Sequence, residues 1–277
     1  NCKIVLVGDN HQLPSVGPGQ ILHDLISSEK LSVVKLTKLY RQGKDSNIIN
    51  LAYDIRRGKI DDSIFNVTED LTFINCPLKD IIPNIMEIAT TYKDVSYKNF
   101  QILAPMYKTL AGIDEINKYV QTIFNPKEKN KKELNVGEVT FKEGDKVIQL
   151  TNMPEENVYN GDIGIIDKIV TSPKKEITID YDGTLVKYTP SNFNNFRLAY
   201  SISIHKSQGS EFDIVIIPLA KNYNKMLYRK LIYTAVTRSK KKLYLIGEKD
   251  ALNMAVANDL ADIRKTTIKD FLINGIK

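Results

Sequence analysis

The stretch AYSISIHKSQGSEFDIVIIPL, residues 199–219, decides the fold of this chain. It begins with alternating apolar residues, passes through a polar turn at residues 205–211 and ends in the unbroken apolar run of residues 214–219. An Ile/Val-rich run of that length predicts a strand buried on both faces of a parallel sheet. The polar turn is then expected at the edge of that sheet, where open α/β folds bind their ligands.

The polar turn carries groups that suit phosphates and sugars. Ser203 and Ser207 carry hydroxyl groups, His205 carries an imidazole and Lys206 carries an ammonium. All of these groups can donate to phosphate oxygens. Gly209 allows the backbone to approach a ligand closely, and Glu211 can accept from a sugar hydroxyl. A solvated turn between two strands is the alternative interpretation.

Residues 201–212, SISIHKSQGSEF, resemble motif V of superfamily 1 helicases in its RecD-like form. The resemblance implies that the hydroxyl residue and the His-Lys pair contact the DNA backbone, while Gly209 and Glu211 face the nucleotide. The first position is Ser203 rather than the commoner Thr, and this change keeps the hydroxyl group.

A second motif lies near the start of the chain. Residues 3–7 (KIVLV) predict a buried strand, and a helix is expected over residues 20–27. Between them, GDNHQLPSVGPG at residues 8–19 resembles motif III of the RecD-like helicases, GDxxQLPSVGxG. The resemblance implies that Gln12 reads the γ-phosphate of ATP and couples it to the DNA site. Without the motif, Gln12 would be interpreted as a surface loop residue.

Two arginines lie in further helicase-like motifs. A strand expected over residues 31–36 precedes TKLYRQ (residues 37–42), which resembles motif IV and implies that Arg41 reaches the γ-phosphate. Residues 231–247, LIYTAVTRSKKKLYLIG, resemble motif VI, which implies that Arg238 is an arginine finger. A guanidinium stays charged and grips phosphate oxygens in a fork. The alternatives are a surface ion pair for Arg41 and pairing with a helix C-terminus for Arg238.

Strand and helix patterns alternate over most of the chain, which predicts βαβ units around a parallel sheet. Helices are expected over residues 46–57, 80–92, 112–124 and 226–238, with strands at 71–75, 100–104 and 243–246. Two short helices are expected after residue 250. The segment QILAPM (residues 101–106) resembles a conserved helicase segment, which implies a DNA contact at Pro105, although Pro105 could simply end a core strand.

The region from residue 125 to 197 has a different pattern. A polar, charge-rich joint at residues 125–135 precedes short alternating segments separated by turns, at residues 146–150, 163–170, 176–181 and 185–188. This pattern predicts a small inserted antiparallel β-barrel. VYNGDIG (residues 158–164) resembles the SH3-like insert of RecD-type helicases, which implies a role for Asn160 beside the exiting DNA strand. A plain hairpin turn explains this segment equally well.

The resemblance covers nearly the whole chain and implies a RecA-like parallel sheet with flanking helices, of the P-loop NTPase type, carrying an SH3-like β-barrel. Residues 1–30 are expected to end a first RecA-like domain, residues 31–124 and 198–277 to form the second, and residues 125–197 to form the insert. The implied activity is that of an ATP-dependent DNA helicase of the exodeoxyribonuclease V alpha subunit family. Such enzymes use ATP and Mg²⁺ and step 5′ to 3′ on single-stranded DNA in recombination and repair.

The sequence contains no GxxxxGK[ST] phosphate loop, and no acidic pair for Mg²⁺ precedes Gln12. Both are expected in an N-terminal motor domain outside this sequence. We therefore expect that the chain alone neither hydrolyses ATP nor unwinds DNA. The implied partners are single-stranded DNA, that motor domain and other exodeoxyribonuclease V subunits. A non-catalytic nucleic-acid-binding module and an RNA-directed superfamily 1 helicase are the alternative functions.

Composition is consistent with a globular protein that binds a polyanion. Of 277 residues, 42% are hydrophobic, which is enough for a packed core and excludes a disordered class. The net charge of +6 favours a polyanionic partner. Cys2 and Cys76 are expected to be buried free thiols, which suits the reducing cytoplasm. No apolar run is long enough for a membrane span, and neither a metal site nor a nuclease cluster is expected.

Overall fold

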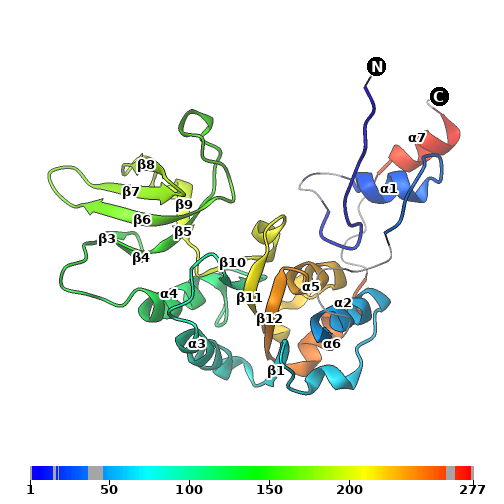
Figure 1. The fold of residues 1–277 in the computed structure, drawn as a ribbon, viewed down its shortest axis with the longest axis horizontal. Helices are drawn as coiled ribbons and strands as arrows, with labels where there is room; N and C mark the ends of the chain where they lie inside the picture. The colour runs from blue at the N-terminus through cyan, green and yellow to red at the C-terminus, as the bar shows by residue number, and fades with distance from the viewer. Residues whose placement is uncertain (1, 15–16, 18, 37–45, 260–265, 276–277) are drawn as a thin grey trace.

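The computed structural model describes residues 2–14, 17, 19–36, 46–259 and 266–275. Figure 1 shows a parallel sheet with helices at the centre of the molecule and an antiparallel sheet to one side. The parallel sheet has the strand order β1-β12-β11-β2-β10. Its strands are β1 (Leu71–Asn75), β2 (Phe100–Ala104), β10 (Ser201–Ser203), β11 (Phe212–Leu219) and β12 (Ser239–Gly247). All their pairings are parallel, as expected.

Helices cover both faces of the parallel sheet (Figure 1). Two helices pack together on one face, α3 (Ile81–Thr91) and α4 (Ile113–Phe124). The opposite face is covered by α5 (Arg229–Val236) and α6 (Lys249–Ala257), with α2 (Asn47–Arg57) packed against α5. Strand β11 is almost completely buried between these layers. This double cover explains why its sequence is an unbroken apolar run.

The remaining helical segments are short. Helices α1 (Ile21–Ser27) and α7 (Ile268–Asn274) contact each other near the chain termini (Figure 1). Short 3₁₀ segments span Asp62–Phe65, Leu78–Asp80, Pro154–Glu156, Phe193–Asn195, Ile204–Ser207 and Lys221–Met226, the last of which is kinked at Asn224. In the part of the chain that the structure describes, no helix combines the length and apolarity that crossing a bilayer requires.

The insert, which we define as β3 to β9 between α4 and β10, is antiparallel throughout. Its main sheet has the order β8-β7-β6-β5-β9, and β3 and β4 form a separate hairpin. The strands are β3 (Glu133–Val136), β4 (Val139–Lys142), β5 (Lys146–Gln149), β6 (Ile163–Val170), β7 (Glu176–Tyr181), β8 (Thr184–Tyr188) and β9 (Phe196–Leu198). The prediction of an antiparallel β insert is confirmed, although β3 begins inside the stretch expected to be a polar joint.

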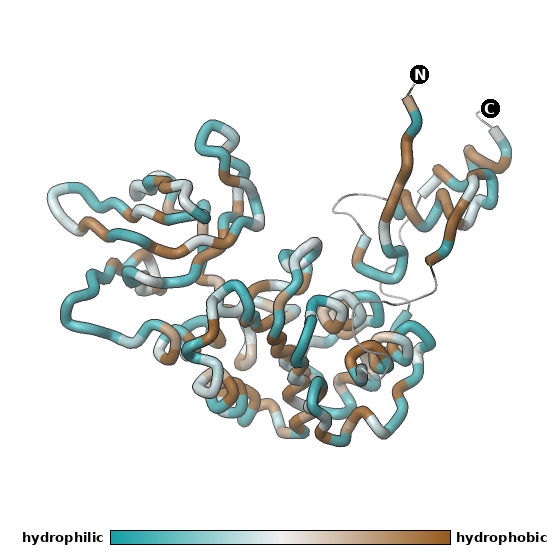
Figure 2. Tube along the Cα trace, viewed as in Figure 1, coloured by the Kyte–Doolittle hydropathy of each residue, from teal (hydrophilic) through white to brown (hydrophobic). Residues whose placement is uncertain are grey.

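Two expected strands do not form in the described structure. Residues 3–7 and 31–36 have no regular secondary structure, and their apolar side chains face solvent, with Val7 and Leu36 both 90% exposed. Figure 2 shows the N-terminal apolar segment running away from the folded body. A strand needs a neighbouring strand for its backbone hydrogen bonds, and no described strand pairs with either segment. The predictions of a buried strand at residues 3–7 and of a strand at residues 31–36 are therefore wrong.

Three smaller expectations also need correction. Helix α5 begins at Arg229 rather than near residue 226, because Tyr228 has extended backbone dihedrals of φ −142° and ψ 155°. The last strand, β12, is longer than expected because it pairs with β11 over that strand's whole length. Both cysteines are free thiols, but Cys2 is exposed and Cys76 is partly buried, so the expectation of two buried thiols is wrong for Cys2.

Candidate nucleotide and DNA site

The three motif segments of the sequence meet in space. The loop at residues 9–14 lies against α5 and against the loop that follows β10. The Leu13 amide donates to the Thr234 hydroxyl at 2.8 Å, and the Gln208 side chain donates to the Leu13 carbonyl at 2.7 Å. Leu13 is only 6% exposed, so these two contacts hold the loop at a buried position.

The side chains of Gln12 and Arg238 are in direct contact. The Arg238 Nη2 donates to the Gln12 Oε1 at 3.0 Å. The same guanidinium donates to the carbonyls of Thr234 and Ser210, each at 3.0 Å, and is 5% exposed. Thr234 lies in the last turn of α5, so pairing with the helix C-terminus and contact with Gln12 occur together.

Asp9 fixes the other end of the Gln12 amide. Its carboxylate accepts from the Gln12 Nε2 at 3.3 Å, from the His11 backbone amide at 2.9 Å and from the Tyr233 hydroxyl at 2.9 Å. Burial, together with the Asp9 charge, raises the pKa of Tyr233, so the hydroxyl stays protonated and donates. Gln12 is therefore oriented by Asp9 on one side and by Arg238 on the other.

His11 extends this cluster to helix α2. Its Nε2 lies 3.1 Å from the Arg56 Nη2, and its ring meets the Tyr233 ring edge-on at 6.2 Å. Burial and the neighbouring Arg56 charge lower the pKa of His11, which favours the neutral imidazole that can accept from a guanidinium.

A cavity of about 420 Å³ opens beside this cluster. Gln12, Gln208, Gly209 and Lys230 contribute to its lining, together with residues of α1 and the preceding loop. Its size lies in the usual range for small-molecule sites. Gly209 has φ +84° and no atom within 4 Å of where a side chain would begin, so its backbone is open to the cavity. Glu211 is not among the lining residues and pairs with Lys240 at 3.7 Å.

The expected DNA-contacting residues form a 3₁₀ turn after β10. The Ser203 hydroxyl accepts from the Lys206 amide at 3.4 Å, and the Ser207 hydroxyl donates to the Ile204 carbonyl at 2.8 Å. Both serines are buried, so their hydroxyls shape the turn. His205 is exposed and Lys206 is half-exposed at the surface of the turn.

The insert reaches this turn through Asn160. The Lys206 ammonium donates to the Asn160 side-chain oxygen, which joins two residues that the sequence assigned separately to DNA contact. Burial lowers the pKa of Lys206. Pro105 is buried at the end of β2, next to β10. Arg41 lies outside the described residues.

Sequence reasoning missed Asp9, Tyr233 and Thr234 as parts of this site. All three lie inside the quoted motif segments, but nothing in their local pattern indicates contacts across more than 200 residues. Within the described ranges, no group of three or more His, Cys, Asp or Glu side chains could hold a metal ion.

Comparison with known proteins identifies three matching segments. Residues 116–181 match the ATP-dependent RecD-like DNA helicase SH3 domain, and residues 198–246 match the UvrD-like helicase C-terminal domain. Residues 1–77 match an AAA domain.

Two curated relatives align along most of the chain. The ATP-dependent RecD2 DNA helicase of Deinococcus radiodurans is 31% identical over 92% of this chain and 34% of that protein. The RecBCD enzyme subunit RecD of Buchnera aphidicola subsp. Acyrthosiphon pisum is 26% identical over 90% of this chain and 50% of that protein. The chain therefore spans between a third and a half of the length of these relatives.

Among solved structures, the Pif1 helicase from Bacteroides in complex with ADP-AlF3 and ssDNA has a similar fold. It aligns with 95% of this chain and 65% of that chain, with a TM-score of 0.51 and 20% sequence identity.

Proposed function

Because the chain belongs to the RecD-like helicases of superfamily 1, we propose that it forms the part of an ATP-dependent DNA helicase that senses the γ-phosphate and binds single-stranded DNA. The observation that carries the proposal is the contact between Gln12 and Arg238. This contact joins the loop at residues 9–14 to the end of α5, beside a cavity of suitable size.

Gln12 and Gly209, which line the cavity, and Arg238, which contacts Gln12, suit ATP. The Arg238 guanidinium can exchange its contact with Gln12 for phosphate oxygens, which are stronger acceptors because they are charged. The Gln12 side-chain amide, which donates to Asp9 in this structure, can then donate to a phosphate oxygen. The open backbone at Gly209 leaves space for a phosphate or a sugar. Glu211 is proposed to accept from the sugar. Arg41 is proposed as a second cation for the γ-phosphate.

Arg238 also connects the proposed nucleotide site to the proposed DNA site. Arg238 holds the Ser210 carbonyl, and Ser210 follows the turn that contains His205 and Lys206. A guanidinium drawn toward the γ-phosphate would release Ser210, so the two sites would favour different arrangements of one loop. We assign the DNA backbone contacts to His205 and Lys206, with Asn160 beside them and the buried hydroxyls of Ser203 and Ser207 shaping the turn.

We propose that the phosphate loop and the Mg²⁺ ligands belong to another part of the protein, since the sequence has no GxxxxGK[ST] segment. Residues 1–277 alone would then not hydrolyse ATP. The proposed assignment keeps residues 1–30 with that other part, residues 31–124 and 198–277 in one RecA-like domain, and residues 125–197 in the insert. Recombination and repair are the proposed processes, with exodeoxyribonuclease V subunits as proposed partners.

The test is ATP hydrolysis by the full-length protein with and without single-stranded DNA. The Arg238→Ala variant is expected to lose DNA-stimulated turnover by a factor on the order of 10³ or more. Arg57→Ala is the matched control, because Arg57 is exposed at the end of α2 and is expected to leave turnover unchanged.

Each alternative function gives a different result in this assay. No stimulated turnover in the wild type would favour a non-catalytic binding module. Stimulation by RNA but not by DNA of the same sequence would favour an RNA-directed helicase, because only RNA carries 2′-hydroxyls. Robust turnover by a pure preparation of residues 1–277 would refute the proposed inactivity of this part.

A further inference from the structure

The insert is attached to the parallel sheet by a buried ammonium. Lys146, the first residue of β5, is 3% exposed. Its Nζ donates to the carbonyls of Tyr97 at 2.7 Å and Phe100 at 3.0 Å, and to the Gln101 Oε1 at 2.8 Å. All three donors of the ammonium are used, which a buried charge requires if it is not to destabilise the fold.

Gln101 continues this attachment to the segment that leaves the insert. Its Nε2 donates to the carbonyls of Ala199 at 3.1 Å and Tyr200 at 3.0 Å. The chain then enters β10 and the turn Ile204–Ser207, which carries the proposed DNA contacts. Through Gln101, the Lys146 ammonium is therefore linked to the backbone that precedes the DNA-binding turn.

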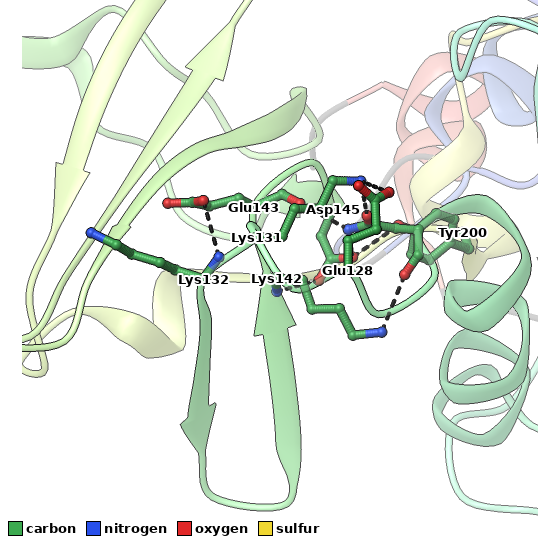
Figure 3. A network of polar contacts seen from close by, with 8 residues as sticks. Glu128, Lys131, Lys132, Lys142, Glu143, Asp145 and Tyr200 are labelled. Carbon is green, nitrogen blue, oxygen red and sulfur yellow. Dashed lines mark hydrogen bonds and ion pairs between the residues drawn. The ribbon is translucent and has the colours of Figure 1, made fainter.

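A second buried cluster fixes the base of the insert (Figure 3). The Asp145 carboxylate accepts from the side chains of Gln121 at 2.6 Å, Asn125 at 2.7 Å and Tyr200 at 3.0 Å, and from the Lys142 amide at 2.7 Å. Burial raises the pKa of Asp145, although these hydrogen bonds act in the opposite direction. The segments that enter and leave the insert are thus held by the same carboxylate.

The far end of β5 supports the turn that contains Asn160. The Gly161 amide donates to the carbonyl of Gln149, the last residue of β5, at 2.9 Å. Asn160 then contacts the Lys206 ammonium. Since β5 is a single strand of four residues, a displacement at Lys146 moves the turn at its other end.

These contacts form a closed circuit. It runs from Lys146 along β5 to Asn160, crosses to Lys206, and returns through β10 and Gln101 to Lys146. We propose that Lys146 is a positioning residue for DNA binding, which holds the insert so that Asn160 orients the Lys206 ammonium toward a phosphate. The inference rests on the proposed DNA contact of Lys206. An ammonium has three donors, so Lys206 can hold Asn160 and a phosphate oxygen together.

The experiment measures the affinity of the full-length protein for single-stranded DNA in a double-mutant cycle. Lys146→Met is expected to weaken binding roughly fivefold, and Asn160→Ala by a similar factor. The double variant is expected to bind no more weakly than Lys146→Met alone, because Asn160 is already misplaced. Lys168→Met, which removes an exposed charge from β6, is the control for simple loss of charge.

The Met side chain is one atom shorter than that of Lys, so it fits the space that Lys146 occupies. Gln101→Met provides a second cycle, since it breaks the same circuit while leaving two carbonyl acceptors for Lys146. Additive effects with Asn160→Ala in either cycle, which a purely structural role would produce, overturn the inference.

Failure of the proposed function gives a different result. If neither the wild type nor Lys206→Ala binds single-stranded DNA measurably, the DNA assignment itself is wrong. If Lys206→Ala weakens binding but Lys146→Met does not, only the positioning role is refuted.

Discussion

Replacing Thr234 with Val should loosen the loop at residues 9–14 from α5. The Thr234 hydroxyl accepts from the Leu13 amide at 2.8 Å and donates to the Lys230 carbonyl at 2.7 Å. Val has a similar shape but leaves the buried Leu13 amide without its acceptor, which costs about 1–3 kcal/mol. That free energy corresponds to a roughly 5- to 150-fold shift in loop opening. The shift in loop opening is measured by hydrogen exchange of the Leu13 amide in the nucleotide-free, full-length protein.

Thr90→Val is the matched control for this measurement. Thr90 lies on α3, and its hydroxyl donates to the Met86 carbonyl four residues earlier at 2.8 Å, as Thr234 does to Lys230. The control removes the same kind of helix contact but no contact with the loop, so exchange at Leu13 should not change. Equal exchange at Leu13 in the wild type and Thr234→Val would refute the docking of the loop through Thr234.

Three further predictions concern charge. Burial lowers the pKa of Lys146 to about 7, so above that pH the folded protein binds fewer protons than the unfolded chain. The free energy of unfolding of the wild type relative to Lys146→Met should therefore rise from pH 7 to 10, by up to about 1.4 kcal/mol per pH unit; parallel curves in urea titrations would contradict this. Replacing His205 and Lys206 with Ala should weaken single-strand binding equally for all sequences and flatten its salt dependence, and unchanged binding would argue against the DNA assignment. Asp70→Ala should destabilise the fold by about 1 kcal/mol in chemical unfolding, because the Asp70 carboxylate accepts from the Ile48 amide in the first turn of α2 and Ala has no acceptor; stability equal to the wild type would show that this acceptor is dispensable.

The strands of the parallel sheet could be predicted because their own residues favour burial. Strand β2 (residues 100–104) is buried between neighbouring strands, and β1 (residues 71–75), at the sheet edge, buries alternate side chains, so both form at the expected positions. Residues 3–7 have a similar composition but no neighbouring strand in the described structure. An apolar pattern shows that the side chains favour burial. It does not show whether a partner strand is present.

The site could be predicted only in part for a related reason. The motifs indicated Gln12 and Arg238 as functional residues, but not that they contact each other across 226 residues. Lys146 and Gln101 gave no signal, because a lysine or glutamine beside an apolar run is usually solvated. Their burial depends on the carbonyls that the fold brings to them, and those carbonyls have no sequence signature.

The position of the insert in the chain has a consequence for engineering this protein. The insert is followed by β10, which lies at one edge of the parallel sheet beside β2. Its entry and exit segments are held at one base by Asp145. Lengthening, trimming or exchanging the insert would leave every interior strand pairing untouched. The insert can therefore be exchanged as a unit, provided that its replacement keeps an acceptor at the position of Asp145 and a lysine able to reach Gln101.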